Sequence, residues 1–370
     1  MGPDDRRSAV PSRLTGMLGI ELPIVQAPMA NSSGVELAVT VCEAGGLGSL
    51  PCAMLTPDQV REQVALVREQ TSRPVNVNFF SHAPADDDPA ALDVWQQRLA
   101  AYYEELGTSA STPARAANRA PFDEAMCELV EELRPEVVSF HFGLPEASLV
   151  DRVRATGATV LSSATSVREA RWLEHHGCDV IIAQGAEAGG HRGIFLSDDV
   201  STQVGTMALV PQVVDAVSVP VVAAGGIADA RGIAAAFALG AEGVQLGTAF
   251  LLCPEAMTSP LHRQALRGTT DDGSAITNVF TGRPARSIVN RAVREVGPMS
   301  DVAPHFPLAA AAIAPLRQAA EETGSADFSP LWSGQAATLS REMPAGELTQ
   351  LLAEEADRLL RMLAASVRGE

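Results

Sequence analysis

Short apolar segments that alternate with amphipathic helical patterns are the feature that most constrains the fold of this chain. Eight such segments are expected to be strands, at 24–29, 45–50, 74–80, 137–143, 159–164, 180–185, 220–225 and 243–250. Each is short, apolar and followed by Gly, Pro or a polar residue, which is typical of strands buried on both faces of a parallel sheet. Helical patterns between them, at 57–70, 122–133 and 166–176 for example, supply the crossovers. Eight strand–helix units predict an α/β fold, a TIM-type (β/α)8 barrel.

Two segments do not follow this repeat. Residues 81–120, after the third strand, are rich in Ala, Pro and Asp, and we expect an insertion at the barrel mouth with a helix at about 91–105. Residues 268–345 show little regular strand pattern and are expected to form a cap over the same mouth, before a last helix at 346–367. The expected division is a barrel over 1–267 and a cap with the C-terminal helix, packed on the barrel, over 268–370.

The charge of the chain excludes several classes of partner. The formal net charge is −18, so the phosphates of nucleic acids and of anionic membranes would be repelled.

All 27 Lys and Arg residues are arginines. Without lysine, chemistry that needs an amine nucleophile is excluded, as are the pyridoxal phosphate enzymes and the P-loop lysine of nucleotide hydrolases.

Cysteine spacing and hydropathy bear on the compartment. The five cysteines include no C-x-x-C pair, which favours free thiols in a reducing, cytoplasmic environment over a disulfide framework or a metal site. The start of the chain has no apolar segment typical of a secretory signal, and the longest apolar runs are too short to span a bilayer.

Glycine-rich loops follow the seventh and eighth predicted strands. The first is AAGGIAD at 223–229, and the second contains Gln245, Leu246, Gly247 and Thr248. Glycine lets backbone N–H groups approach a ligand closely, and barrels often hold a phosphate at these two loops. The pair predicts a phosphate site made of neutral donors, with simple tight turns as the alternative.

Two histidines are candidates for proton transfer. His191 lies on a glycine-rich loop after the sixth strand, in the run QGAEAGGHRG at 184–193, and His141 lies in the fourth strand with its side chain expected on the opposite face to Phe140 and Phe142. A lone histidine is more often structural, but two at strand ends of one barrel favour function. His175, His176 and His262 are expected to be solvated or to cap helices.

These runs, together with PIVQAPMA at 23–30 and GVQLGTAFL at 243–251, resemble the nitronate monooxygenase (2-nitropropane dioxygenase-like) family. The resemblance extends from about residue 18 to residue 355. It implies an FMN-binding barrel without a metal, which oxidises small alkyl nitronates with molecular oxygen to a carbonyl compound and nitrite and does not require reduced nicotinamide.

The resemblance also implies roles for single residues. Pro28 and Met29 would lie beside the flavin ring, and Asn78, Gln184 and Gln245 would hydrogen-bond the ring or the ribityl chain. Gly189, Gly226, Leu246, Gly247 and Thr248 would complete the cofactor site near the ribityl chain or the phosphate. His191 matches the catalytic histidine of the family, and His141 is expected to help bind the substrate. Residues 332–337 (WSGQAA) resemble a further motif expected near the flavin.

Several alternatives remain open at this point. An FMN-dependent enoyl-acyl-carrier-protein reductase, or another NAD(P)H-dependent reductase of the same superfamily, would share the Gly-Gly-His pattern. An enzyme similar to IMP dehydrogenase would need a nucleophilic cysteine after the sixth strand, where this chain has His191. A phosphosugar isomerase or lyase would use the same phosphate loops, usually with a Glu or Lys base. A flavin-binding protein without turnover is the last alternative.

Overall fold

A computed structural model describes residues 12–84, 88–110 and 120–368. Eight parallel strands form one sheet in the order β1-β9-β8-β6-β5-β4-β3-β2. The strands are β1 (Ile24–Gln26), β2 (Gly48–Pro51), β3 (Val75–Phe80), β4 (Val137–His141), β5 (Thr159–Ala164), β6 (Val180–Gln184), β8 (Val221–Ala224) and β9 (Gly243–Leu246). A parallel bridge between Val25 and Leu47 joins β1 to the start of β2, so the sheet is nearly closed. The predicted TIM-type barrel is confirmed.

Four strands differ from the prediction by two or more residues at an end, among them β1, which was expected to reach residue 29 and ends at Gln26. Residues 45–47 form a turn whose Leu47 bonds with β1, so β2 begins only at Gly48. Strand β4 ends at His141 because Phe142 adopts a left-handed backbone conformation with φ +73°. Strand β9 ends at Leu246, where the short helix η3 (Thr248–Phe250) takes over.

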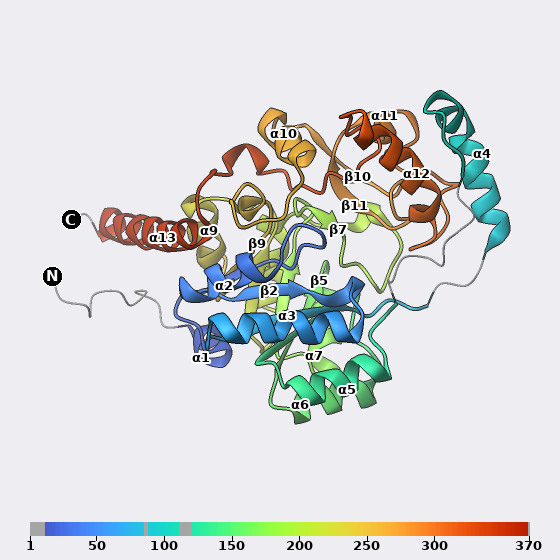
Figure 1. The fold of residues 1–370 in the computed structure, drawn as a ribbon. Coiled ribbons are helices and arrows are strands. Elements are labelled where there is room, and N and C mark those ends of the chain that lie inside the picture. Colours follow the sequence, from blue (N-terminus) through green and yellow to red (C-terminus); the bar gives the residue numbers. More distant parts are fainter. Residues whose placement is uncertain (1–11, 85–87, 111–119, 369–370) are drawn as a thin grey trace.

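A ring of helices covers the outside of the barrel (Figure 1). It comprises α2 (Val35–Glu43), α3 (Pro57–Gln70), α5 (Glu124–Leu133), α6 (Ala147–Ala155), α7 (Val167–His175), α8 (Thr206–Val214), α9 (Ala230–Ala238) and α13 (Ala345–Arg368). Helix α3 begins where predicted, because Thr56 and Gln59 form a capping box around Pro57 at the first helical position. Helix α13 packs against both α9 and α2 and so completes the ring of helices. In the sequence, the cap lies between the eighth strand of the barrel, β9, and α13.

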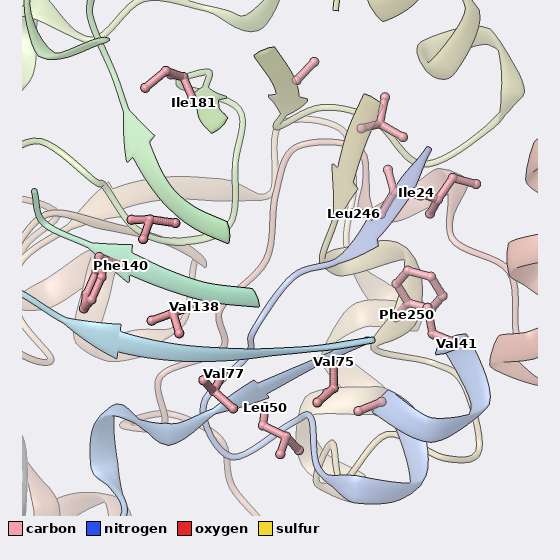
Figure 2. Packing of buried hydrophobic residues seen from close by; sticks show 14 of the residues in the cluster. Ile24, Val41, Leu50, Val75, Val77, Val138, Phe140, Ile181, Leu246 and Phe250 are labelled. Carbon is pink, nitrogen blue, oxygen red and sulfur yellow. The ribbon is translucent and has the colours of Figure 1, made fainter. Parts of the chain in front are cut away.

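Two apolar cores hold the barrel together. The larger one lies between the strands and the surrounding helices, and Figure 2 shows Leu50, Val77, Val138 and Leu246 among its buried members. The second core includes strand residues such as Val25 and Leu161, which lie on the opposite face of the sheet from the strand residues of the larger core. Leu14 and Leu18 of α1 (Arg13–Leu18) belong to this second core.

The cap contains more regular structure than predicted. Its elements are β10 (Ser274–Thr277), β11 (Ala285–Ile288), α11 (Arg291–Glu295), α12 (Ala309–Glu322) and η4 (Ala337–Leu339). The short elements η1 (Cys52–Met54), η2 (Val200–Thr202) and α10 (Pro260–Gly268) lie earlier in the chain. Strands β10 and β11 form an antiparallel hairpin that pairs with β7 (Gly190–His191). The sequence of 268–345 did not reveal these two strands, because each is only four residues long and lacks the alternation that reveals longer ones.

The insertion after β3 joins the cap. Helix α4 (Pro89–Glu105), expected at about 91–105, lies beside α12 in Figure 1 and contacts it. Trp95 and Tyr103 of α4 share a third apolar cluster with cap residues such as Leu316 and Phe328. Residues 85–87 and 111–119 of the predicted insertion, and the first eleven residues, lie outside the described part. The division of the chain near residue 267 stays a prediction.

No helix within the described residues is long and apolar enough to cross a membrane. All five cysteines are buried free thiols.

Candidate functional site

A cavity of about 570 Å³ lies at the carboxyl ends of the barrel strands, where the cap faces the barrel. Its size is ordinary for a small-molecule or cofactor site. The lining includes His141, His191, Pro28, Met29, Asn78, Gln184, Gly189, Gly226, Gln245, Gly247 and Thr248. Every residue predicted for the site except Leu246 thus borders one space, as expected for the end of a barrel where loops carry function.

Leu246 is the exception. Its side chain is buried in the core between strands and helices (Figure 2), because neighbours in a strand point to opposite faces and Gln245 already faces the mouth. Its carbonyl accepts a hydrogen bond from the Ala27 N–H. The structure therefore gives the Leu246 side chain a packing role and no contact with the cavity.

The loops after β6, β8 and β9 pack closely together around one edge of the cavity. Gly226 has φ +70°, a conformation that favours glycine, and lies against the side chain of Glu187. Gly334 donates its N–H to the Thr248 hydroxyl at 2.9 Å, and Gln335 donates to the Glu187 carbonyl at 3.0 Å. The segment 332–337 thus lies between these loops, and its Trp332, Gly334 and Ala336 border the cavity.

Two features of this edge fit a ligand with a hydrogen-bond donor. The Gln245 Oε1 is buried and has no hydrogen-bond partner among the described residues, although a buried amide oxygen ordinarily has one. A Cβ atom added at Gly247 would extend to 3.5 Å from the Ala27 Cβ and 3.6 Å from the Met29 sulfur, two residues of the cavity wall. A side chain at residue 247 would therefore occupy space at the cavity edge without colliding with the protein.

His191 is held at the cavity wall by the cap. It pairs with Ala285 of β11, and its Nε2 lies 2.9 Å from the Thr281 hydroxyl. The rings of Phe142, Phe306 and Trp332 surround it, with centroids 5.9, 5.5 and 5.3 Å from the imidazole. Sequence reasoning missed Thr281, because a single threonine in an irregular segment carries no pattern that links it to a loop 90 residues earlier.

His141 is fixed on both sides of its ring. Nε2 lies 3.1 Å from the carbonyl oxygen of His191, and Nδ1 lies 3.1 Å from the hydroxyl of Ser163. A carbonyl can only accept, so Nε2 donates and Nδ1 accepts from Ser163. Burial, with smaller contributions from Arg283 and Arg192, lowers the pKa of His141 to about 4, which keeps the ring neutral near pH 7.

Two amides that were predicted to bind a cofactor have partners in the protein. Asn78 donates to the carbonyl and the hydroxyl of Ser139. Gln184 donates from Nε2 to the His191 carbonyl at 3.1 Å and accepts the Gly193 N–H on Oε1 at 2.8 Å. Gln184 therefore braces the loop of His191 as well as bordering the cavity.

Buried arginines support the same loop from behind. Arg192 is fully buried and donates to the carbonyls of Gly185 and Gln184, both at 2.7 Å, and to the Gln203 side chain at 2.8 Å. Arg286 donates to the Ala186 carbonyl at 2.9 Å, and the Arg283 guanidinium lies 3.9 Å from the centre of the Phe142 ring. Burial, followed by the charge of Arg286, lowers the pKa of Arg192 to about 10, so it stays charged at neutral pH.

His262 was predicted wrongly as solvated or capping. It is 7% exposed, borders the cavity, and donates from Nε2 to the Trp332 carbonyl at 3.1 Å. Burial lowers the pKa of this imidazole to about 4. Its position in a polar helix gave no hint that the cap would cover it, whereas His175 and His176 do lie exposed at the end of α7, as predicted.

The cap contributes a second set of residues to the cavity lining. Helix α12 contributes the small side chains of Ala310, Ala311 and Ala314 and the larger ones of Ile313 and Arg317, and Pro307, Phe280 and Trp332 also belong to the lining. Within the part of the chain that the structure describes, no group of three or more His, Cys, Asp or Glu side chains is placed to hold a metal ion.

Comparisons with known proteins agree in one family. The family model described as nitronate monooxygenase matches residues 11–355. A nitronate monooxygenase of Pseudomonas aeruginosa is 42% identical over 93% of this chain and 98% of its own length. The solved structure of nitroalkane oxidase from Streptomyces ansochromogenes superimposes with a TM-score of 0.87 at 40% identity, covering 95% of this chain and 99% of that one. FabK from Thermotoga maritima gives 0.72 at 27% identity, covering 96% and 99%.

Proposed function

Because the chain belongs to the nitronate monooxygenase family, we propose that it oxidises small alkyl nitronates with molecular oxygen to a carbonyl compound and nitrite, using FMN bound at the barrel mouth. The observation that carries the proposal is the position of His191. It lies at the wall of a cavity whose other edge is formed by the glycine-rich loops after β8 and β9. The same cavity can therefore hold a phosphate at backbone N–H groups of the glycine-rich loops and bring a small substrate next to His191.

The residues at the barrel end fit FMN. The backbone of Gly226, Gly247 and Thr248 can approach a phosphate, and the unpaired Gln245 Oε1 can accept a hydrogen bond from the ring. Pro28 and Met29 line the wall against which the ring would lie, and Asn78, Gln184 and Gly189 complete its border. When bound, FMN supplies an oxidised ring that takes electrons from the nitronate and passes them to oxygen.

The protein residues bind and orient the anion. The charge of a nitronate is spread over its carbon and nitro oxygens, and the net charge of −18 would repel it. The buried arginines behind the loop of His191 counter that field locally, since they remain charged in a poorly solvated region. His191 then contacts the anion, with Thr281 orienting its ring. With a neutral nitroalkane, His191 would act as the base that removes the α-proton.

The cap excludes water from this step. The rings of Phe142 from the barrel and of Phe306 and Trp332 from the cap surround His191 and would limit the access of bulk solvent to it. The small side chains of α12 leave space for the alkyl group of the substrate. The five free, buried cysteines support a reducing compartment, and we place the protein in the cytoplasm on that basis.

The reductase alternative is not favoured. The curated relatives at 36–42% identity, which cover almost the whole chain, are named as nitronate monooxygenases or probable ones. The nitroalkane oxidase structure is also more similar to this chain than FabK is, both in identity and in TM-score.

Oxygen consumption and nitrite formation test the proposal. Purified protein loaded with FMN should consume oxygen when a nitronate is added, and should form nitrite without NADH or NADPH. If reduced nicotinamide is required, or if no nitronate supports oxygen uptake, the proposed reaction is wrong.

A further inference from the structure

We infer that His141 is a positioning residue, which fixes the backbone of the His191 loop, and that it does not bind the substrate. The inference rests on the proposed function of His191. Both ring nitrogens of His141 already have partners in the protein, at 3.1 Å each. A neutral imidazole has one donor and one acceptor, so no nitrogen is left to contact a nitronate.

Ser163 sets the orientation of the His141 ring. Its side chain is 4% exposed, and its hydroxyl bonds to Nδ1. With Ser163 donating on one side and the His191 carbonyl accepting on the other, only the Nε2–H tautomer satisfies both contacts. Strand β5 carries Ser163 and β4 carries His141, so the arrangement is built on two neighbouring strands of the rigid barrel.

The loop is shaped to receive this contact. The His191 carbonyl accepts hydrogen bonds from both His141 and Gln184. Gly193 passes so close to the ring that an added Cβ would lie 3.1 Å from the His141 Cε1 and 3.0 Å from the Ser163 Cβ. A larger residue at this position would therefore push the loop away from the barrel.

The contact matters because it fixes the backbone that carries the candidate catalytic ring. The His191 ring meets Thr281 on its Nε2, while its own carbonyl is tied to the barrel. If the carbonyl moves, the ring cannot keep its place relative to a ligand bound at the barrel end. A displacement of about 1 Å at such a group can cost about 100-fold in rate.

Two amide substitutions separate positioning from substrate binding. The Gln amide nitrogen reaches the place of Nε2, whereas the shorter Asn amide reaches only the place of Nδ1. We expect His141→Gln to keep kcat within about 3-fold of the wild type, and His141→Asn to lose about 10- to 100-fold, with little change in KM for the nitronate in either variant. A loss in His141→Gln equal to that in His141→Asn, or a raised KM in His141→Gln, would show that the imidazole itself contacts the substrate.

Two further measurements keep the inference testable if the Asn variant does not fold or the wild type does not turn over. In ¹⁵N NMR of the FMN-loaded wild type at pH 7, His141 should be the neutral Nε2–H tautomer. Gly193→Ala should disturb the His141 resonances through the close contact, whereas Gly268→Ala, which meets no atom within 4 Å, should not. A charged ring, an Nδ1–H tautomer or unchanged resonances in Gly193→Ala would overturn the inference. An inactive wild type with the expected tautomer and shifts would refute only the proposed reaction.

Discussion

His191 has its place because of residues that are distant in sequence. Thr281 from the cap and His141 and Gln184 from the barrel each lie within hydrogen-bond distance of one part of it, and Ala285 of β11 lies opposite it in the β7–β11 pair. Groups that hold a reacting side chain in this way contribute to rate by keeping the geometry productive.

Replacing His191 by Asn keeps a hydrogen-bond donor and removes the titratable proton. Activity with a neutral nitroalkane should fall by about 10²- to 10⁴-fold, because no base remains to take the α-proton. With a preformed nitronate the loss should be smaller. Steady-state rates with both forms measure the difference, and His305→Asn, on an exposed cap residue, is the control. Equal and slight losses with both substrates would make His191 a structural residue.

Gly247→Ala tests the cofactor edge without straining the protein. The new Cβ meets protein atoms only at ordinary contact distances, yet it stands at the cavity wall, so FMN retention should fall. Flavin bound per protein after gel filtration measures this, with Gly268→Ala as the control. Retention at the wild-type level would mean that the phosphate is held elsewhere. Gly226→Leu should also release FMN, but its left-handed backbone would be strained as well.

At the residue scale, the sequence allowed a set of cavity-lining residues at the strand ends to be predicted, because glycine-rich loops and histidines at strand ends are local patterns. It could not reveal which polar groups were already paired. Asn78, Gln184 and His141 all have protein partners that depend on strand order and loop packing. The Leu246 side chain does not reach the cavity for a simpler reason: the alternation of β9 directs its neighbour Gln245, and not Leu246, to the mouth.

At the scale of elements, the cap and α4 form one unit around their own apolar cluster. Trp95 is fully buried there and donates from Nε1 to the Ala309 carbonyl at 3.3 Å. The barrel helices belong to a different cluster. The sequence predicted α3 and α4 well because both have clear N-terminal capping signals with Pro at the first turn. The packing of α4 against α12 depends on contacts between segments about 200 residues apart, and the pairing of β11 with β7 joins residues more than 90 apart, which no local pattern encodes.

Trp95→Ala should loosen the cap and leave the barrel folded. Loss of a buried tryptophan costs about 3–5 kcal/mol, and the cost falls on the cluster that α4 shares with α12. Hydrogen exchange should rise in α4 and α12 and stay unchanged in α6 and α7, with Val94→Ala, at an exposed position, as the control. If the whole protein instead loosens evenly, cap and barrel form one cooperative unit and the division near residue 267 has no energetic meaning.

At the scale of the whole molecule, two buried neutral histidines make stability depend on pH. The pKa values of His141 and His262 are lowered from 6.5 to about 4, so between those values the unfolded chain binds protons that the folded protein does not. The free energy of unfolding therefore falls as pH drops through this window. By pH 5 the loss should be about 2 kcal/mol per histidine.

Urea unfolding at pH 7 and pH 5 measures this effect. His262→Gln should remove about half of the difference between the two pH values, because one of the two groups no longer titrates. The same difference in His262→Gln as in the wild type would show that carboxylates, not these histidines, govern the pH dependence.

The absorption spectrum of the purified protein during anaerobic addition of a nitronate is the decisive test of FMN-dependent nitronate oxidation. The protein should be yellow and release FMN, not FAD, on denaturation. A nitronate should bleach the flavin absorbance without NADH or NADPH, and the colour should return when oxygen is admitted. A colourless protein that cannot be loaded with FMN would contradict the account. So would a bound flavin that reduced nicotinamide bleaches rapidly and that nitronates leave oxidised.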